Sequence, residues 1–207
     1  MKFKTVVGID EVGRGPIAGP VAVCALAIRR DQLINQKGKY TMVHFEKFKD
    51  SKKLSHKQRL VWLEKINEER DKGNIFYKVS FESNKVIDDK GIVFAITRAL
   101  ENSLEYLNKN KGDCEVLLDG GLKAPVEYKN QKTIIKGDEK ELAIALASIV
   151  AKVTRDALMV RLACKYTGYG LEKHKGYGTA EHYRALKDKG ISMIHRKSFL
   201  CKFTGAK

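Results

Sequence analysis

Residues 5–11 read Thr-Val-Val-Gly-Ile-Asp-Glu, a largely apolar run that ends in two adjacent acids. The β-branched side chains of this run favour an extended backbone, so we predict a buried strand over residues 5–9. Two carboxylates directly after a buried strand are costly to remove from water unless something compensates their charge. Asp10 and Glu11 are therefore the first candidates for a functional site.

Other patterned segments extend outward from this strand. Apolar or β-branched runs predict four further strands, at residues 21–28, 74–81, 115–118 and 132–135. Helical spacing predicts helices at residues 55–72, 86–108, 141–166 and 179–189, with Ser55 and Thr179 as N-caps. The many small residues between 143 and 151 predict that the third helix packs closely on the sheet. We therefore expect an α/β fold, with a five-stranded mixed sheet flanked by helices.

The composition narrows the class of partner. Lys and Arg total 40 against 25 Asp and Glu, which gives a formal net charge of +15. Such a surplus favours a polyanion such as nucleic acid, although a basic chain can also bind an acidic membrane surface. The four cysteines form no CxxC pair and predict a reducing compartment. Because no apolar stretch approaches a membrane span or a signal peptide, we expect a cytoplasmic protein that binds no membrane.

Two more predicted strands end close to an acid. Asp119 follows the strand at 115–118, and Asp138 follows the strand at 132–135. If these strands neighbour the first, four carboxylates converge on one small volume at the carboxyl edge of the sheet. Such a group repels itself unless a cation neutralises it, and oxygen ligands suit Mg²⁺ or Mn²⁺. No His or Cys flanks any of these acids, which argues against zinc.

Single acids also have plainer interpretations. Asp138 could be a helix N-cap, with Glu141 three residues on as in a capping box. Asp119, which precedes two glycines, could be an ordinary turn residue. Taken one at a time, these alternatives fit better than a metal ligand. The shared feature of three separate strand ends favours the metal site.

A longer pattern now adds to this reading. The segment GIDEVGRGPIAGP at 8–20 resembles the opening signature of the ribonuclease HII family. Further segments match motifs of that family in the same order: DSKKLS at 50–55, LDG at 118–120, KGD at 136–138, ASIVAKVTRD at 147–156, HKGYGT at 174–179 and HRKSF at 195–199. The resemblance covers nearly the whole chain, from Gly8 to Phe199.

The resemblance implies a ribonuclease H-like fold in a single domain over residues 1–207. Its core would cover about residues 1–166, and a helical C-terminal part, about residues 167–207, would lie over the substrate groove. It implies that four acids are both catalytic residues and metal ligands: Asp10, Glu11, Asp119 and Asp138. Two divalent ions, Mg²⁺ or Mn²⁺, would then act together, one lowering the pKa of a bound water and the other stabilising the leaving 3′ oxygen.

Residues that contact substrate follow from the same resemblance. Gly13, Arg14 and Gly15 would read the 2′-hydroxyl beside the scissile bond, and Tyr177 would stack on the sugar that follows the ribonucleotide. Lys52 and Lys53 would contact backbone phosphates, as would some of the nine Lys and Arg between Gly170 and Lys207. The alternatives are a plain tight turn, a half-buried tyrosine and a solvated basic surface.

The implied activity is endonucleolytic cleavage of the RNA strand in RNA–DNA hybrids, and cleavage 5′ of single ribonucleotides embedded in duplex DNA. The products would carry 5′-phosphate and 3′-hydroxyl ends, and the protein would act as a monomer. Three rivals stay open: a non-catalytic nucleic-acid-binding module, another nuclease of the same fold such as a resolvase or ribonuclease HIII, and a metal-dependent phosphatase.

Two departures from the family pattern concern one loop. Gly121 stands where the family usually has a polar residue, and the stretch from Asp119 to Asp138 is long. Both departures affect the loop next to the acids, whose local geometry could therefore differ from that of the family.

Overall fold

Five strands form one mixed sheet in the order β5-β2-β1-β6-β7 in the computed structural model, which describes residues 4–36, 39–42, 45, 54–107 and 111–204. The strand bounds are β1 Thr5–Val12, β2 Val21–Arg29, β5 Ile75–Glu82, β6 Cys114–Asp119 and β7 Gln131–Ile134. Strand β2 runs antiparallel to both β1 and β5, whereas β1, β6 and β7 are mutually parallel neighbours. The predicted five-stranded mixed sheet is confirmed.

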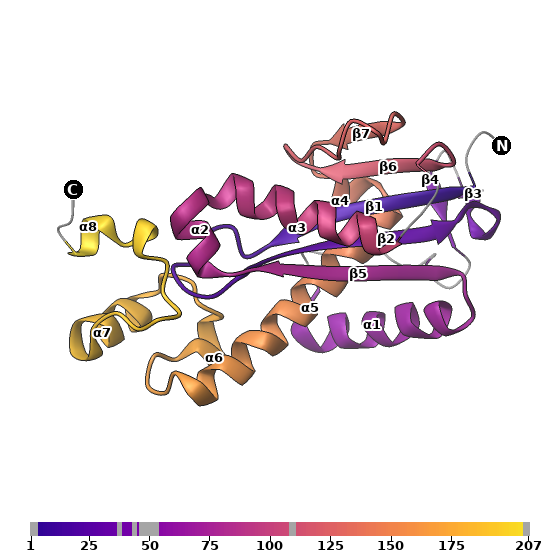
Figure 1. Ribbon diagram of the computed structural model, residues 1–207. Coiled ribbons are helices and arrows are strands. Elements are labelled where there is room, and N and C mark those ends of the chain that lie inside the picture. The colour runs from indigo at the N-terminus through magenta and orange to yellow at the C-terminus, as the bar shows by residue number, and fades with distance from the viewer. Residues whose placement is uncertain (1–3, 37–38, 43–44, 46–53, 108–110, 205–207) are drawn as a thin grey trace.

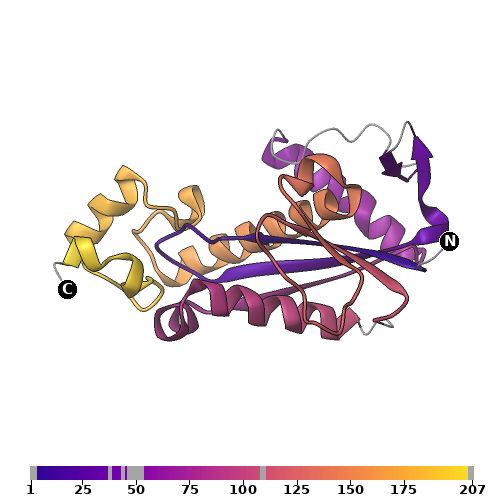
Figure 2. The same cartoon turned by 90° about the horizontal axis from the view of Figure 1, so that it is seen from above.

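Helices cover both faces of this sheet (Figures 1 and 2). Helices α1, His56–Asp71, and α5, Leu142–Lys165, lie on one face, and α3, Ile92–Leu107, lies on the other. Each face has its own apolar core, because side chains alternate along a strand: Val7 and Ile9 pack towards α3, and Val6 packs towards α5. No helix in the described ranges is long and apolar enough to cross a membrane.

Helix α5 lies unusually close to strand β1. A Cβ atom added to Gly8 would sit 2.1 Å from the carbonyl carbon of Ala143, so no larger residue fits there. Much of α5 is buried, and its small residues allow the close approach. The packing predicted from residues 143–151 is confirmed, and it brings the first turns of α5 against β1.

One segment that we predicted as a single helix forms two helices in the structure. We predicted a single helix over 86–108, but the structure has α2, Asn84–Lys90, and α3, separated by Gly91. Gly91 has a φ of 85°, a conformation that glycine adopts at little cost and that ends a helix. The apolar spacing continues across the break, which is why periodicity alone gave one helix. The caps predicted at Ser55 and Thr179 are confirmed, because each side chain accepts an amide N–H of its helix.

Short elements complete the chain. The 3₁₀ helix η1, Arg30–Gln32, leads into a two-stranded hairpin of β3, Ile34–Gln36, and β4, Lys39–Thr41. Helix α4, Gly137–Lys140, precedes α5. After α5 come α6, Leu171–His174, α7, Ala180–Lys189, the 3₁₀ helix η3, Lys197–Phe199, and α8, Cys201–Thr204. These last elements surround a third apolar cluster and lie beyond the carboxyl ends of β1 and β6 (Figures 1 and 2).

Candidate active site

The three strands that carry the candidate acids are adjacent and parallel. Ile9 pairs with Leu118 across β1 and β6, so the residues that follow them, Asp10 and Asp119, lie side by side in the two strands. Neighbouring strands lie about 5 Å apart, and paired residues of parallel strands point to the same face. The backbone alone therefore brings these two carboxylates together, as the strand-end pattern predicted.

The exact positions of the acids differ from the predicted strand ends. Asp10 and Glu11 lie inside β1, which continues to Val12, and Asp119 is the last residue of β6. Asp138 comes four residues after the end of β7, within helix α4. The N-cap of α4 is Lys136 and that of α5 is Glu141, so the capping-box interpretation of Asp138 and Glu141 is wrong.

A hydrogen bond links the β6 and β7 ends of the site. Oδ1 of Asp119 accepts from the amide of Gly137 at 2.7 Å, next to Asp138. Asp138 itself is buried, with 2 % of its surface exposed. A Cβ on Gly137 would lie 2.5 Å from the side chain of Ile144, so this turn also fits tightly against α5. The main chain next to Asp138 is thereby fixed against Asp119, although Asp138 itself is not among the residues that line the cavity shared by the other three acids.

Three of the acids line one open cavity with a volume of about 330 Å³. The lining residues are Asp10, Glu11, Val12, Arg59, Asp119, Ser148, Ile149, Lys152 and Tyr177. These side chains come from β1, β6, α1, α5 and the loop before α7. The cavity thus lies between the carboxyl edge of the sheet and the C-terminal helices, and it contains both anions and cations.

Burial makes ionisation of the first two acids unfavourable. The pKa of Asp10 is raised to about 7, mainly because burial desolvates the carboxylate, with repulsion from Glu11 and Asp119 adding to the effect. The hydroxyl of Ser148 and the amide of Glu11 oppose this rise by hydrogen bonding to Asp10. Burial also raises the pKa of Glu11, against the attraction of Arg14. A cation in the cavity would remove most of this electrostatic cost.

The donor chemistry fits a hard divalent cation, because these ligands are all carboxylates. In the described part of the chain, however, no three Asp, Glu, His or Cys side chains already stand close enough to hold an ion. Asp119 and Asp10 each turn one oxygen towards a main-chain amide, of Gly137 and of Glu11 respectively. The backbone places Asp10 and Asp119 in register, whereas their carboxylates hydrogen-bond to neighbouring main-chain amides.

The glycine loop beside the acids is held rigidly from below. Gly13 has a φ of 90°, and a Cβ there would lie 2.2 Å from Nε of the buried Arg155. The guanidinium of the equally buried Arg196 donates to the carbonyl oxygens of Gly13, at 2.7 Å, and of Arg14, at 3.0 Å. Arg14 and Gly15 are exposed, and Nη1 of Arg14 forms an ion pair with Oε1 of Glu11 at 3.5 Å.

Tyr177 lies next to this loop. Its side chain is 42 % exposed and lines the same cavity as Asp10 and Glu11. A Cβ on Gly15 would be 3.9 Å from the Tyr177 ring, so the loop and the ring are direct neighbours. The structure therefore gathers Gly13, Arg14, Gly15 and Tyr177 around the acids. Lys52 and Lys53 lie outside the described residues.

Three cavity residues were not identified from the sequence as site residues. Ser148 and Lys152 belong to the matched segment 147–156, but only the packing of α5 on β1 places them beside Asp10. Lys152 is also held by Asp156, at 2.9 Å between Nζ and Oδ1. Arg59 lies in the first turns of α1, and no local pattern distinguishes it from its neighbouring cations.

The unusual loop after Asp119 is well anchored. The side-chain amide of Gln131 accepts from the amide of Ala124 at 2.9 Å and donates to three carbonyl oxygens of the same loop. Leu122 and Tyr128 are buried in the core against α3. No atom would lie within 4 Å of a Cβ on Gly121, which is exposed. The long loop therefore packs against α3, and its residues 121–126 line a cavity of about 410 Å³ together with Arg14.

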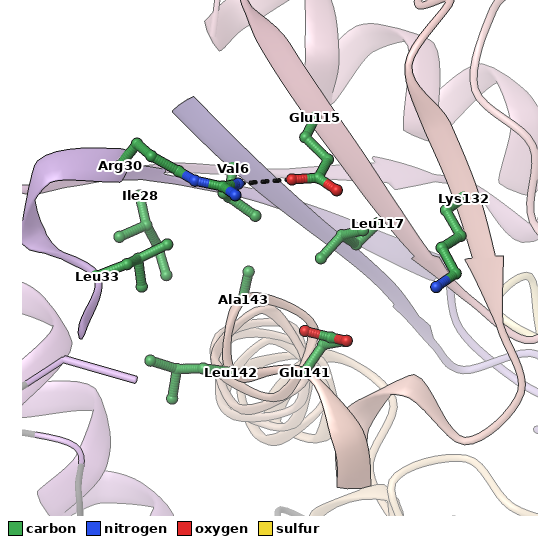
Figure 3. A pocket seen from close by; sticks show the side chains of 10 residues that line it. All are labelled: Val6, Ile28, Arg30, Leu33, Glu115, Leu117, Lys132, Glu141, Leu142 and Ala143. Atoms are coloured by element: carbon green, nitrogen blue, oxygen red, sulfur yellow. Dashed lines mark hydrogen bonds and ion pairs between the residues drawn. The ribbon is translucent and has the colours of Figure 1, made fainter. Parts of the chain in front are cut away.

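A second cavity lies at the opposite end of the strands and has a different character (Figure 3). Its volume is about 110 Å³, and its floor is apolar, with Val6, Leu117 and Ala143 among the lining residues. At its rim Nη1 of Arg30 bonds to Oε2 of Glu115 at 2.6 Å (Figure 3). The cavity at the carboxyl ends is larger and is lined by three of the four candidate acids, so it is the candidate active site.

Comparison with known proteins identifies the fold and the family of this chain. The described fold matches the solved structure of the PCNA:RNase HII complex from Archaeoglobus fulgidus, with a TM-score of 0.69 and 26 % identity over 93 % of each chain. The ribonuclease HII of Caldicellulosiruptor bescii is 43 % identical over 96 % of this chain and 87 % of its own length. That of Fusobacterium nucleatum is 43 % identical over 98 % of this chain and 88 % of its own.

The fold and the acidic cavity at its carboxyl edge define a nuclease of the ribonuclease H class. The family model for ribonuclease HII matches residues 7–202. The chain belongs to the ribonuclease HII family, and the predicted family and fold are both confirmed. It is a ribonuclease H enzyme, so the alternatives of a non-catalytic binding module and of a phosphatase are wrong.

Proposed function

We propose that this enzyme cuts the RNA strand of RNA–DNA hybrids and cuts 5′ of single ribonucleotides within duplex DNA, using two divalent ions. Asp10, Glu11, Asp119 and Asp138 are the proposed ligands, and Mg²⁺ or Mn²⁺ the proposed ion. One observation carries the proposal: three adjacent parallel strands lead their acids to one edge, where Asp10, Glu11 and Asp119 line one cavity. We further propose that the protein acts as a monomer.

The residues around this site favour the binding of cations. When bound, the ions would supply an activated water and stabilise the leaving 3′ oxygen. Burial of Asp10 and Glu11 raises the pKa of both, so their carboxylates gain more from a cation than exposed acids would. The hydroxyl of Ser148 hydrogen-bonds to Asp10 and opposes the rise of its pKa, which restrains the side chain as well. The expected products carry 5′-phosphate and 3′-hydroxyl ends.

Discrimination against DNA would come from the neighbouring loop. Gly13, Arg14 and Gly15 are the proposed contacts to the 2′-hydroxyl, the group by which RNA differs from DNA. Support comes from the two carbonyls that Arg196 binds, because a fixed main chain can select a hydroxyl position. Tyr177, within reach of this loop and half exposed, is proposed to stack on the following sugar.

Cations around the cavity would bind backbone phosphates. Arg59 and Lys152 lie in the cavity with the acids, and the net charge of +15 extends the attraction over the surface. Lys52 and Lys53 are proposed phosphate contacts as well. Such contacts position a duplex without reading its sequence, and they weaken as salt rises.

The direct test is cleavage of a DNA duplex that contains one ribonucleotide, beside an all-DNA duplex. We expect a single cut on the 5′ side of the ribonucleotide with Mg²⁺ or Mn²⁺, and none when a chelator is present. The all-DNA duplex should stay intact under every condition. Cleavage that persists in chelator, or equal cleavage of both duplexes, would refute the proposed function.

A further inference from the structure

Three histidines, two of them buried and His174 partly buried, form a group next to the main chain of Tyr177. His182 and His195 are fully or almost fully buried, and their Nε2 atoms are 3.0 Å apart. His174 stacks on His182 with 4.3 Å between ring centroids. Nδ1 of His182 lies 2.9 Å from the carbonyl oxygen of Tyr177. None of these imidazoles lines the acidic cavity, so the proposed chemistry leaves them without a role.

Both ends of this group fix the direction of its hydrogen bonds. The carbonyl of Tyr177 can only accept, so Nδ1 of His182 must carry the proton. At the other end the amide of Ser192 donates to Nδ1 of His195 at 3.1 Å, so that nitrogen is bare. His195 then donates from Nε2 to the bare Nε2 of His182. One chain of donors runs from Ser192 through His195 and His182 to Tyr177.

One further contact of His195 points the other way. Its Nδ1 is also 3.3 Å from the carbonyl oxygen of Ser192, which would need a proton on that nitrogen. The amide of Ser192 at 3.1 Å and its hydroxyl at 2.9 Å are closer, and a bare Nδ1 satisfies both. The shorter contacts therefore decide the tautomer, and nitrogen chemical shifts of the two imidazoles can verify it.

The chain requires neutral imidazoles. Burial lowers the pKa of His182 to about 4 and lowers that of His195 as well, so both are neutral at pH 7. The titratable side chains that face His182 are those of His174 and His195, and both oppose a charge on it. A proton on His182 would also turn two N–H groups towards each other at the His182–His195 contact.

Acid should therefore weaken the fold through His182. Between pH 6.5 and 4 an unfolded His182 binds a proton that the folded one excludes, so the free energy of unfolding falls as pH falls. His182→Asn lacks this effect. We expect the urea midpoint of the wild type to exceed that of the variant at pH 7, and the gap to shrink towards pH 4. A gap that stays constant would contradict the lowered pKa.

The residue after His195 anchors the other half of the substrate site. Arg196 binds the carbonyls of Gly13 and Arg14, whereas His195 reaches Tyr177 through His182. The main chain of Arg196 is also hydrogen-bonded to the segment that follows the glycine loop, because the Arg196 amide donates to the carbonyl of Ile17 at 2.8 Å. The adjacent residues His195 and Arg196 thus connect Tyr177 and the glycine loop to the same short segment of the chain.

We propose that Ser192, His195 and His182 form a positioning relay that holds Tyr177 in register with the glycine loop, and so determine the preference for an isolated ribonucleotide. This inference rests on the proposed function, since it concerns the substrate contact of Tyr177. The relay touches neither substrate nor acids. Its members act only through the position of residue 177.

A double-mutant cycle separates this role from a general contribution to folding. The readout is the ratio of kcat/KM on a duplex with one ribonucleotide to kcat/KM on a uniform RNA–DNA hybrid. His182→Phe keeps the volume and loses the donor, and we expect the ratio to fall about tenfold, since small misplacements carry large kinetic costs. In a Tyr177→Ala background His182→Phe should change the ratio no further.

Matched variants sharpen the cycle. His182→Asn keeps an N–H near the position of Nδ1 and should restore most of the ratio. His56→Phe, at the exposed start of α1, is the control and should leave the ratio unchanged. The proposal is overturned if His182→Phe leaves the ratio at the wild-type value, lowers both rates equally, or lowers the ratio in the Tyr177→Ala background as much as in the wild type.

The same cycle read on binding distinguishes failure of the relay from failure of the proposed function. Affinity for the two duplexes is measured by fluorescence anisotropy in chelator. If the wild type cuts neither duplex, this binding measurement still tests the relay. Loss of binding preference that is absent in the Tyr177→Ala background would then support the relay without the activity. Additive losses would overturn the relay, whichever duplexes are cut.

Discussion

Asp10→Asn is expected to reduce cleavage of the single-ribonucleotide duplex by at least about a thousandfold, equivalent to about 4 kcal/mol of transition-state stabilisation. The reason is position: Asp10 interacts electrostatically with both Glu11 and Asp119, and it belongs to β1, the central strand of the five-stranded sheet. Asparagine preserves the shape and removes the charge. Duplex affinity, measured by anisotropy in chelator, should stay within about threefold, because phosphate contacts are left intact.

Asp71→Asn provides the matched control for this prediction. Asp71 ends helix α1, and its exposed side chain forms only a surface ion pair with Arg70, at 3.5 Å. The same chemical change there should leave kcat/KM within about twofold, because surface pairs contribute little. Comparable losses in the two variants would mean that general charge, and not a specific carboxylate, accounts for the effect.

Gly8→Ala is expected to lower the free energy of unfolding by at least about 3 kcal/mol, since the new methyl meets main-chain atoms that cannot yield without moving α5. The added Cβ would be 2.1 Å from the Ala143 carbonyl carbon and 2.2 Å from its oxygen. In a protein of this size we expect the melting temperature to drop by roughly 6–12 °C. Calorimetry or a thermal melt followed by circular dichroism measures both quantities.

Gly121→Ala is the control substitution. Its Cβ would meet no atom within 4 Å, and its φ is outside the left-handed region, so we expect a change below about 0.5 kcal/mol. If Gly8→Ala were as mild as Gly121→Ala, the close packing of α5 on β1 would not be what sets the position of Ser148 beside Asp10.

Much of the fold could be predicted because the sequence pattern and the local physics agree. The β-branched run before Asp10 and the apolar run after Pro20 are strands that tolerate few alternatives, and Ser55 and Thr179 cap helices as their hydroxyls suggest. The helix break at Gly91 was missed because the apolar period continues through it. The positive-φ conformation of Gly91 ends the helix although the apolar spacing continues.

Some residues of the candidate site could be predicted from the sequence and others could not. Its acids could be found because each lies in or shortly after one of three neighbouring parallel strands, near the carboxyl end of that strand. Ser148 and Arg59 could not, because their place in the cavity depends on how helices dock. The bonds from His182 to Tyr177 and from Arg196 to Gly13 join parts of the chain whose relation depends on the folded C-terminal helices. No sequence period encodes such contacts.

A crystal structure with Mn²⁺, located by its anomalous scattering, tests the central claim most directly. We predict manganese between Asp10, Glu11, Asp119 and Asp138, with carboxylate oxygens turned inward from their present amide partners. Manganese bound elsewhere while these four carboxylates keep their present orientations would contradict the account.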